Sequence, residues 1–156
     1  MIRSTAKALL LREGKILLNR CRKDSGEIYY DLPGGGQHDF EPLEEAVARE
    51  VLEETGYQIQ VDGFAALCEE IWTDRSLIER FPEYSHRMLH IFKAHVVSET
   101  QEKPSELDYR QEGFVWMSPE EADALPLLPK SLTGKVGQVL ADSSPVWLGT
   151  TYENDF

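Results

Sequence analysis

Apolar positions along the chain fall into short segments separated by polar or glycine-containing turns, a pattern typical of β-strands. Near the N-terminus two such segments, Ser4–Arg12 and Lys15–Arg22, flank Glu13-Gly14, which predicts a β-hairpin. Further strands are expected at Ile28–Leu32, Gln58–Val61, Phe64–Trp72, Met88–Val97, Gly113–Met117 and Pro145–Tyr152. The sequence therefore predicts a sheet, and the polar stretch Thr73–Arg87 is long enough to shape a pocket or a partner surface.

Helical periodicity replaces strand alternation in three places. The longest predicted helix begins near Pro42, which suits a first helical turn, and ends at Gly56, a common C-terminal stop. Val47, Val51 and their neighbours give this helix an apolar face beside a row of glutamates, so one face should pack on the sheet while the other lines a site. Shorter helices are expected at Pro119–Ala124, after a Ser118 cap, and at Lys130–Ala141.

Length and charge limit the function. The 156 residues suit one domain, residues 1–156, with a single core. A net charge of −12 repels polyanions, which argues against a surface for polymeric nucleic acid. The apolar run Ala8–Leu11 is too short for a signal or a membrane span, so we expect a cytoplasmic protein and no membrane contact. Cys21 and Cys68 are expected to be buried free thiols rather than a disulfide.

Three glutamates on the long helix carry the clearest chemical signal. Glu50, Glu53 and Glu54 stand at i, i+3 and i+4, so they share one helical face. Carboxylates gathered in this way repel one another unless a positive group lies among them. A hard divalent cation with oxygen ligands, Mg²⁺ or Mn²⁺, is the natural partner. The spacing therefore predicts a metal site, although a solvated acidic face is the common fate of such a helix.

The segment around these glutamates resembles the signature of the Nudix hydrolases, Gly-x5-Glu-x7-Arg-Glu-aliphatic-x-Glu-Glu-x-Gly-aliphatic. The fixed positions are all matched, by Gly35, Glu41, Arg49, Glu50, Glu53, Glu54 and Gly56. Val51 fills the first aliphatic position, whereas Tyr57, which is apolar but aromatic, departs from the second. Leu32-Pro33-Gly34 before the motif and Gly113–Met117 after it are also similar to the family.

The resemblance implies an α/β/α sandwich with a mixed β-sheet and an enzyme that hydrolyses a nucleoside diphosphate linked to another group. Such a substrate is a small phosphorylated molecule, for example a nucleotide or a nucleotide sugar such as ADP-ribose. Glu50, Glu53 and Glu54 would hold Mg²⁺, for which Mn²⁺ could substitute, and Glu53 or Glu54 could accept the proton of the attacking water. Arg49 would orient a glutamate, either Glu41 or Glu53.

Residues at the edge of the motif are weaker candidates. Gly35 and Gly36 would let the chain approach a ligand closely, and the carbonyl group of either could complete the coordination of the metal. Arg20 and Arg22 could reach a substrate phosphate, or they could be ordinary surface charges. Glu112 could be a further metal ligand or a solvated loop residue. Four aromatic residues could stack on a base, although core packing is the more common role at strand positions: Tyr29, Tyr30, Trp72 and Trp116.

Two other functions compete with hydrolysis. The first is a ligand-sensing Nudix domain that binds such a compound without cleaving it, a reading that the intact glutamates disfavour. The second is an isomerase such as that of isopentenyl diphosphate, which needs a catalytic cysteine that neither Cys21 nor Cys68 is placed to supply. Homodimers are common in the family, and the sequence does not decide between a monomer and a homodimer.

Overall fold

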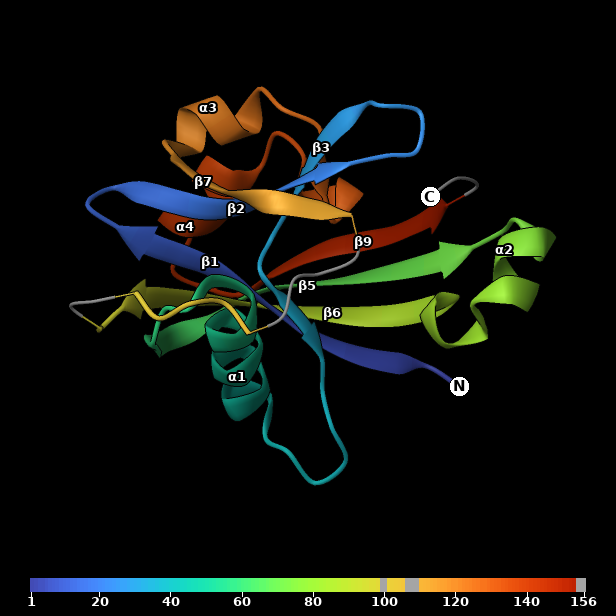
Figure 1. The fold of residues 1–156 in the computed structure, drawn as a ribbon, viewed down its shortest axis with the longest axis horizontal. Coiled ribbons are helices and arrows are strands. Elements are labelled where there is room, and N and C mark those ends of the chain that lie inside the picture. Colours follow the sequence, from blue (N-terminus) through green and yellow to red (C-terminus); the bar gives the residue numbers. More distant parts are fainter. Residues whose placement is uncertain (99–100, 106–109, 154–156) are drawn as a thin grey trace.

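The computed structural model describes residues 1–98, 101–105 and 110–153, which form a curved mixed sheet between helices (Figure 1). The strands are β1 (Arg3–Arg12), β2 (Lys15–Arg22), β3 (Ile28–Asp31), β4 (Gly34–Gly36), β5 (Ile59–Trp72), β6 (His86–Val96), β7 (Gln111–Met117), β8 (Leu127–Leu128) and β9 (Val146–Glu153). The helices are α1 (Leu43–Thr55), α2 (Arg75–Arg80), α3 (Pro119–Asp123) and α4 (Val136–Ala141), with 3-10 turns at Pro82–Tyr84 and Lys130–Leu132. No helix in these ranges is long and apolar enough to cross a membrane.

The sheet has the strand order β8-β3-β2-β1-β6-β5-β9, while β4 pairs with β1 and β7 pairs with β2. β1 and β2 form the predicted hairpin, in which Arg12 pairs with Lys15. β1 runs parallel to β6 and antiparallel to β4, so the central strand joins the motif glycines to the rest of the sheet. The predicted mixed sheet is confirmed.

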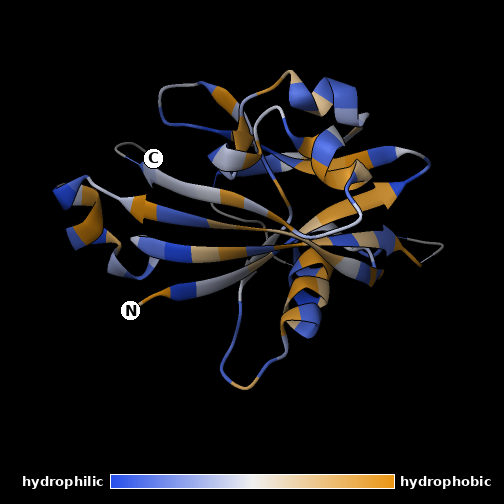
Figure 2. Ribbon diagram, turned by 180° about the vertical axis from the view of Figure 1, so that it is seen from behind, coloured by the Kyte–Doolittle hydropathy of each residue, from blue (hydrophilic) through white to orange (hydrophobic). Residues whose placement is uncertain are grey.

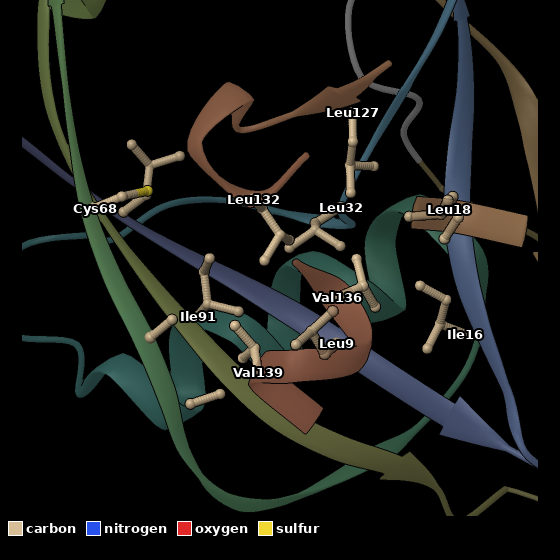
Figure 3. Close-up of a cluster of buried hydrophobic side chains, with 14 of the residues drawn as sticks. Leu9, Ile16, Leu18, Leu32, Cys68, Ile91, Leu127, Leu132, Val136 and Val139 are labelled. Atoms are coloured by element: carbon tan, nitrogen blue, oxygen red, sulfur yellow. The ribbon is translucent and has the colours of Figure 1, made fainter. Parts of the chain in front are cut away.

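Each face of the sheet buries its own core because side chains alternate along the strands. On one face, Leu9 of β1 and Ile91 of β6 pack with Val136 and Val139 of α4, as Figure 3 shows. On the other face, Ala8 and Leu10 pack against the apolar side of α1. Figure 2 shows that α1 carries both hydrophobic and hydrophilic residues along its length. Helices on both faces confirm the predicted α/β/α sandwich.

Two local predictions differ from the structure, and a third segment, predicted only as polar, contains short helices. β5 is one continuous strand where two were expected, because irregular pairing between Val61 and Gly63 absorbs the break. The helix expected over Lys130–Ala141 is broken, because Gly134 has a φ of 73°, which a helix does not allow. The polar stretch Thr73–Arg87 contains α2 and a 3-10 turn, and Asp74 caps α2 by accepting hydrogen bonds from two backbone amides.

Candidate active site

Arg49 lies at the centre of the motif carboxylates. Its guanidinium donates to both oxygens of Glu41, with Nε to Oε2 at 2.7 Å and Nη2 to Oε1 at 2.9 Å. Nη1 donates to Glu50 Oε1 at 2.9 Å and to Glu53 Oε2 at 3.3 Å. Nη2 also donates to the carbonyl of Gly36 at 3.0 Å. The pairing predicted for Arg49 is confirmed, and it involves both of the glutamates proposed as alternatives.

Glu41 reaches Arg49 from the loop before α1. The loop is closed by its own hydrogen bonds, since the His38 amide donates to Glu41 Oε1 at 3.1 Å and the Gln37 side chain donates to the Glu41 carbonyl at 2.6 Å. The hydrogen bonds from Arg49 lower the pKa of Glu41 to about 2. The same contacts, with Glu41 first among them, raise the pKa of Arg49. This bidentate pair therefore stays charged across the physiological range.

Glu50 lies against the glycines of β4. A Cβ atom added to Gly35 would be 2.5 Å from Glu50 Oε2, so a residue with a side chain at this position would displace the carboxylate. Burial raises the pKa of Glu50, and the neighbouring Arg49 only partly offsets that effect. The negative charge of Glu50 is thus partly buried and only partly compensated by its neighbours Arg49 and Lys7.

Glu54 is buried and is held by residues of β2 and β4. Its Oε2 accepts hydrogen bonds from Asn19 Nδ2 at 3.0 Å and from the Gly34 amide at 3.1 Å. Asn19 is held in turn by Gln111, whose Nε2 donates to Asn19 Oδ1 at 3.1 Å. Two strands therefore set the position of this glutamate.

Sequence reasoning missed three residues that support the site: Asn19, Gln111 and Lys7. Asn19 carries a signal that could have found it, because it is a polar residue inside the apolar strand β2. Lys7 is buried in β1, and its Nζ donates to the carbonyls of Leu32 at 3.1 Å and Gly34 at 3.2 Å. These bonds hold the chain that leads into the glycines.

The structure places Glu112 with the two candidate arginines of β2. Glu112 Oε2 accepts from Arg20 Nη1 at 2.7 Å, and Glu112 also accepts a hydrogen bond from Arg22. These contacts lower the pKa of Glu112, with the hydrogen bond from Arg22 as the main cause. The three residues form one partly exposed group held together by these ion pairs.

The candidate aromatic residues separate into two groups. Tyr29 and Trp72 line a cavity of about 200 Å³ between β3, β5 and β6. Burial raises the pKa of Tyr29 to about 12, so its hydroxyl stays protonated at neutral pH. Tyr30 instead packs against the α4-side core, and Trp116 packs against the α1-side core.

The same cavity contains two buried glutamates. Glu70 of β5 forms an ion pair with Arg87 of β6, and Glu153 of β9 forms one with Lys130. Among the described residues, the Glu153 Oε1 atom and the Arg87 Nε atom are buried and have no hydrogen-bond partner. The cavity therefore combines aromatic surface with charged groups that retain hydrogen-bonding capacity.

The carboxylates around Arg49 fit a divalent cation in their chemistry. Glu41, Glu50 and Glu53 contribute three negative charges against the one positive charge of Arg49. Oxygen donors and a surplus of two negative charges suit Mg²⁺. Within residues 1–98, 101–105 and 110–153, no three acidic, histidine or cysteine side chains converge on one cation position, because the guanidinium lies between the carboxylates.

Comparison with known proteins supplies the classification. A family model described as the NUDIX domain matches residues 1–138. The chain belongs to the Nudix hydrolase family. The enzymes of this Nudix family hydrolyse pyrophosphate bonds, so the chain is a pyrophosphohydrolase that acts on phosphorus-containing acid anhydrides.

Individual relatives share between 17% and 28% of their residues with this chain. The chain is 28% identical to the CTP pyrophosphohydrolase of Escherichia coli K12 over 126 residues, which cover 80% of this chain and 82% of the relative. The MutT protein of Bacillus halodurans superimposes with a TM-score of 0.73 at 20% identity, covering 97% of this chain and 90% of that one. An ADP-ribose pyrophosphatase of Streptococcus suis gives 0.57 at 17% identity, covering 97% and 98%. The last two likenesses show the Nudix fold alone.

Proposed function

We propose that this protein is a single-domain Mg²⁺-dependent hydrolase that cleaves the pyrophosphate bond of a nucleoside diphosphate linked to another group. Mn²⁺ would substitute for Mg²⁺. The observation that carries the proposal is the group of carboxylates around Arg49, whose negative charge exceeds the positive charge available to it. A diphosphate cannot approach such a group without a cation, because like charges repel. Cys21 and Cys68 are both buried, as is common for reduced cysteines, which supports a cytoplasmic location.

The roles of the motif residues follow from their contacts. Glu50, Glu53 and Glu54 would hold the cation, with a carbonyl of the Gly35-Gly36 segment as a further ligand. Bound there, the cation would neutralise the phosphate oxygens and lower the pKa of the attacking water. Glu53 is suited to accept the water proton, because its side chain is 31% exposed compared with 17% for Glu50. Arg49 would keep Glu50 and Glu53 oriented.

The arginines on β2 would contact the substrate. Arg20 and Arg22 present guanidinium groups whose planar donors suit phosphate oxygens. Glu112 accepts hydrogen bonds from both, which supports a role in orienting them. Metal ligation by Glu112 remains a second prediction for the same carboxylate.

The nucleoside part of the substrate would enter the cavity beside Tyr29 and Trp72. Aromatic surface and unpaired polar atoms there suit a base and its hydrogen-bonding edge. Similarity to a CTP pyrophosphohydrolase supports a nucleoside triphosphate as the substrate, with ADP-ribose as the alternative from the nucleotide sugars.

A substrate panel tests the proposal. Purified protein would be incubated with CTP, the other nucleoside triphosphates and ADP-ribose, with Mg²⁺, with Mn²⁺ and with chelator. We expect release of the nucleoside monophosphate from at least one compound, and only when metal is present. No hydrolysis of any compound with metal present would reject the proposal. Tight calorimetric binding without turnover would instead support the ligand-sensing alternative.

A further inference from the structure

Arg3 is a cation beside the motif and has no role in the proposed hydrolysis. It lies at the start of β1 and is partly exposed. Its Cζ atom is 4.8 Å from the centre of the Tyr84 ring. Its Nη2 atom lies 2.3 Å from where a Cβ atom on Gly36 would be, so the guanidinium packs on the bare backbone of that glycine. In a chain of net charge −12, Arg3 forms no ion pair with any carboxylate of the described ranges.

The position of Arg3 links the two parts of the site. Arg3 of β1 is paired in register with Arg87 of β6, and Arg87 is paired with Glu70 of β5. Residues paired across neighbouring strands share one face of a sheet, so Arg3, Arg87 and Glu70 form a row across three strands. Arg87 and Glu70 line the cavity, and Arg3 is the next residue in this row. On its other side, Arg3 contacts Gly36, whose carbonyl accepts a hydrogen bond from Arg49.

We propose that Arg3 binds a phosphate group of the substrate at the point where it passes from the nucleoside cavity to the motif carboxylates. This inference rests on the proposed function, since it assumes a diphosphate in the site. A planar guanidinium pairs with phosphate through two parallel hydrogen bonds. The Tyr84 ring supports the guanidinium by a cation–π contact, which holds it in place and leaves its N–H groups for the ligand.

Two structural roles would also place an arginine here. Arg3 could balance the surplus negative charge of the carboxylates, or it could anchor the Pro82–Tyr84 turn to the sheet. The first role predicts tighter Mg²⁺ binding when the charge is removed, because one competing cation is lost. The second predicts a lower thermal midpoint. Neither predicts weaker binding of a diphosphate.

The test uses methylenediphosphonate, a non-hydrolysable diphosphate, with calorimetric titration in the presence of saturating Mg²⁺. R3Q should weaken its binding by about tenfold or more, the scale of one charge-assisted hydrogen-bonded pair. R3K should recover part of the affinity. The matched control is K15Q, which removes one positive charge at the exposed end of the hairpin, away from Arg3 along β1, and should bind as the wild type does.

Other measurements separate the interpretations. Wild-type affinity in R3Q, tighter Mg²⁺ binding without loss of diphosphonate binding, or absence of diphosphonate binding by the wild-type protein would each overturn the inference. A thermal midpoint is recorded for every variant, and R3K, which keeps the charge, decides the result if R3Q unfolds. If the wild type hydrolyses substrate and R3Q binds methylenediphosphonate with wild-type affinity, only the role proposed for Arg3 is rejected. A wild type that hydrolyses nothing but binds diphosphonate through Arg3 rejects the proposed function alone.

In the same experiment Tyr84 is tested as a positioning residue. Y84L keeps the charge of Arg3 but removes the ring beneath its guanidinium. We expect a smaller loss of diphosphonate affinity than in R3Q, and no additional loss when the two changes are combined. Independent, additive losses would show that Tyr84 does not act through Arg3.

Discussion

Glu53 differs from the other carboxylates that contact Arg49 because its side chain is the most exposed, at 31%. Its side chain is therefore open to water, and replacing it with glutamine removes its charge and its capacity to accept a proton. We expect E53Q to lower kcat by at least ~10²-fold with Mg²⁺ saturating, the lower scale for loss of a general base. E54Q should lower kcat to a similar extent.

Steady-state kinetics on a substrate identified by the panel would measure this effect. E45Q is the matched control, since Glu45 is an exposed residue in the first turn of the same helix and should retain wild-type turnover. Unchanged rates in both E53Q and E54Q would show that the catalytic roles are misassigned.

Glu41 gives a second prediction, on the pH dependence of stability. Its pKa falls from 4.5 to about 2 on folding, so its charged form stabilises the fold above pH 4.5, and that contribution is lost as the pH falls toward 2. E41Q should therefore lower the free energy of unfolding at neutral pH by about 1 kcal/mol. Urea unfolding of both proteins at several pH values would measure the difference, which should shrink steadily below pH 4.5. A difference that stayed constant in acid would contradict an ionic role for Glu41.

At the scale of the elements, α1 was predictable because its signals are local. Pro42 immediately precedes its first residue, and Gly56 follows its last with a φ of 78°. The amide of Gly56 donates to the Leu52 carbonyl at 2.9 Å and so closes the helix. Patterns that act over a few residues also gave the hairpin of β1 and β2.

Gly56 supports a prediction at this scale. A Cβ atom there would lie 1.8 Å from the Glu102 carbonyl oxygen. The residue carrying it would also have to adopt the left-handed backbone conformation of Gly56. G56A should therefore lower the free energy of unfolding by about 2 kcal/mol or more. G63A is its control, because Gly63 has ordinary φ and open space where a Cβ would be. Urea unfolding that found the two variants equally stable would contradict this account of the helix end.

Features that depend on contacts between distant segments could not be predicted from the sequence. The resemblance to the Nudix signature limited the predicted partners of Arg49 to Glu41 and Glu53, and the contact with Glu50 was not predicted. The Asn19–Glu54 bond joins residues 35 positions apart, and the contact between Arg3 and Gly36 depends on the pairing of β1 with β4. β4 itself has no side chains to produce an alternating pattern, so only its neighbours could reveal it as a strand.

For the molecule as a whole, the net charge of −12 separates binding of a small phosphorylated ligand from binding of a polymer. A small diphosphate needs positive charge at one point, which a cation and a few arginines can supply. A duplex presents phosphates over a long surface and gains affinity by releasing counterions from many contacts with lysine and arginine. An acidic surface offers too few such contacts.

We therefore expect the protein to bind duplex DNA more weakly than ~10⁻⁴ M at physiological salt, the weak end of non-specific association. Fluorescence anisotropy with a labelled duplex, with and without Mg²⁺, would measure this, and a basic DNA-binding protein of similar size would verify the assay. Binding in the micromolar range that fell steeply with added salt would contradict the prediction. It would show that arginines such as Arg20 and Arg22 extend into a continuous basic surface, in which case the substrate could be the end of a nucleic acid chain.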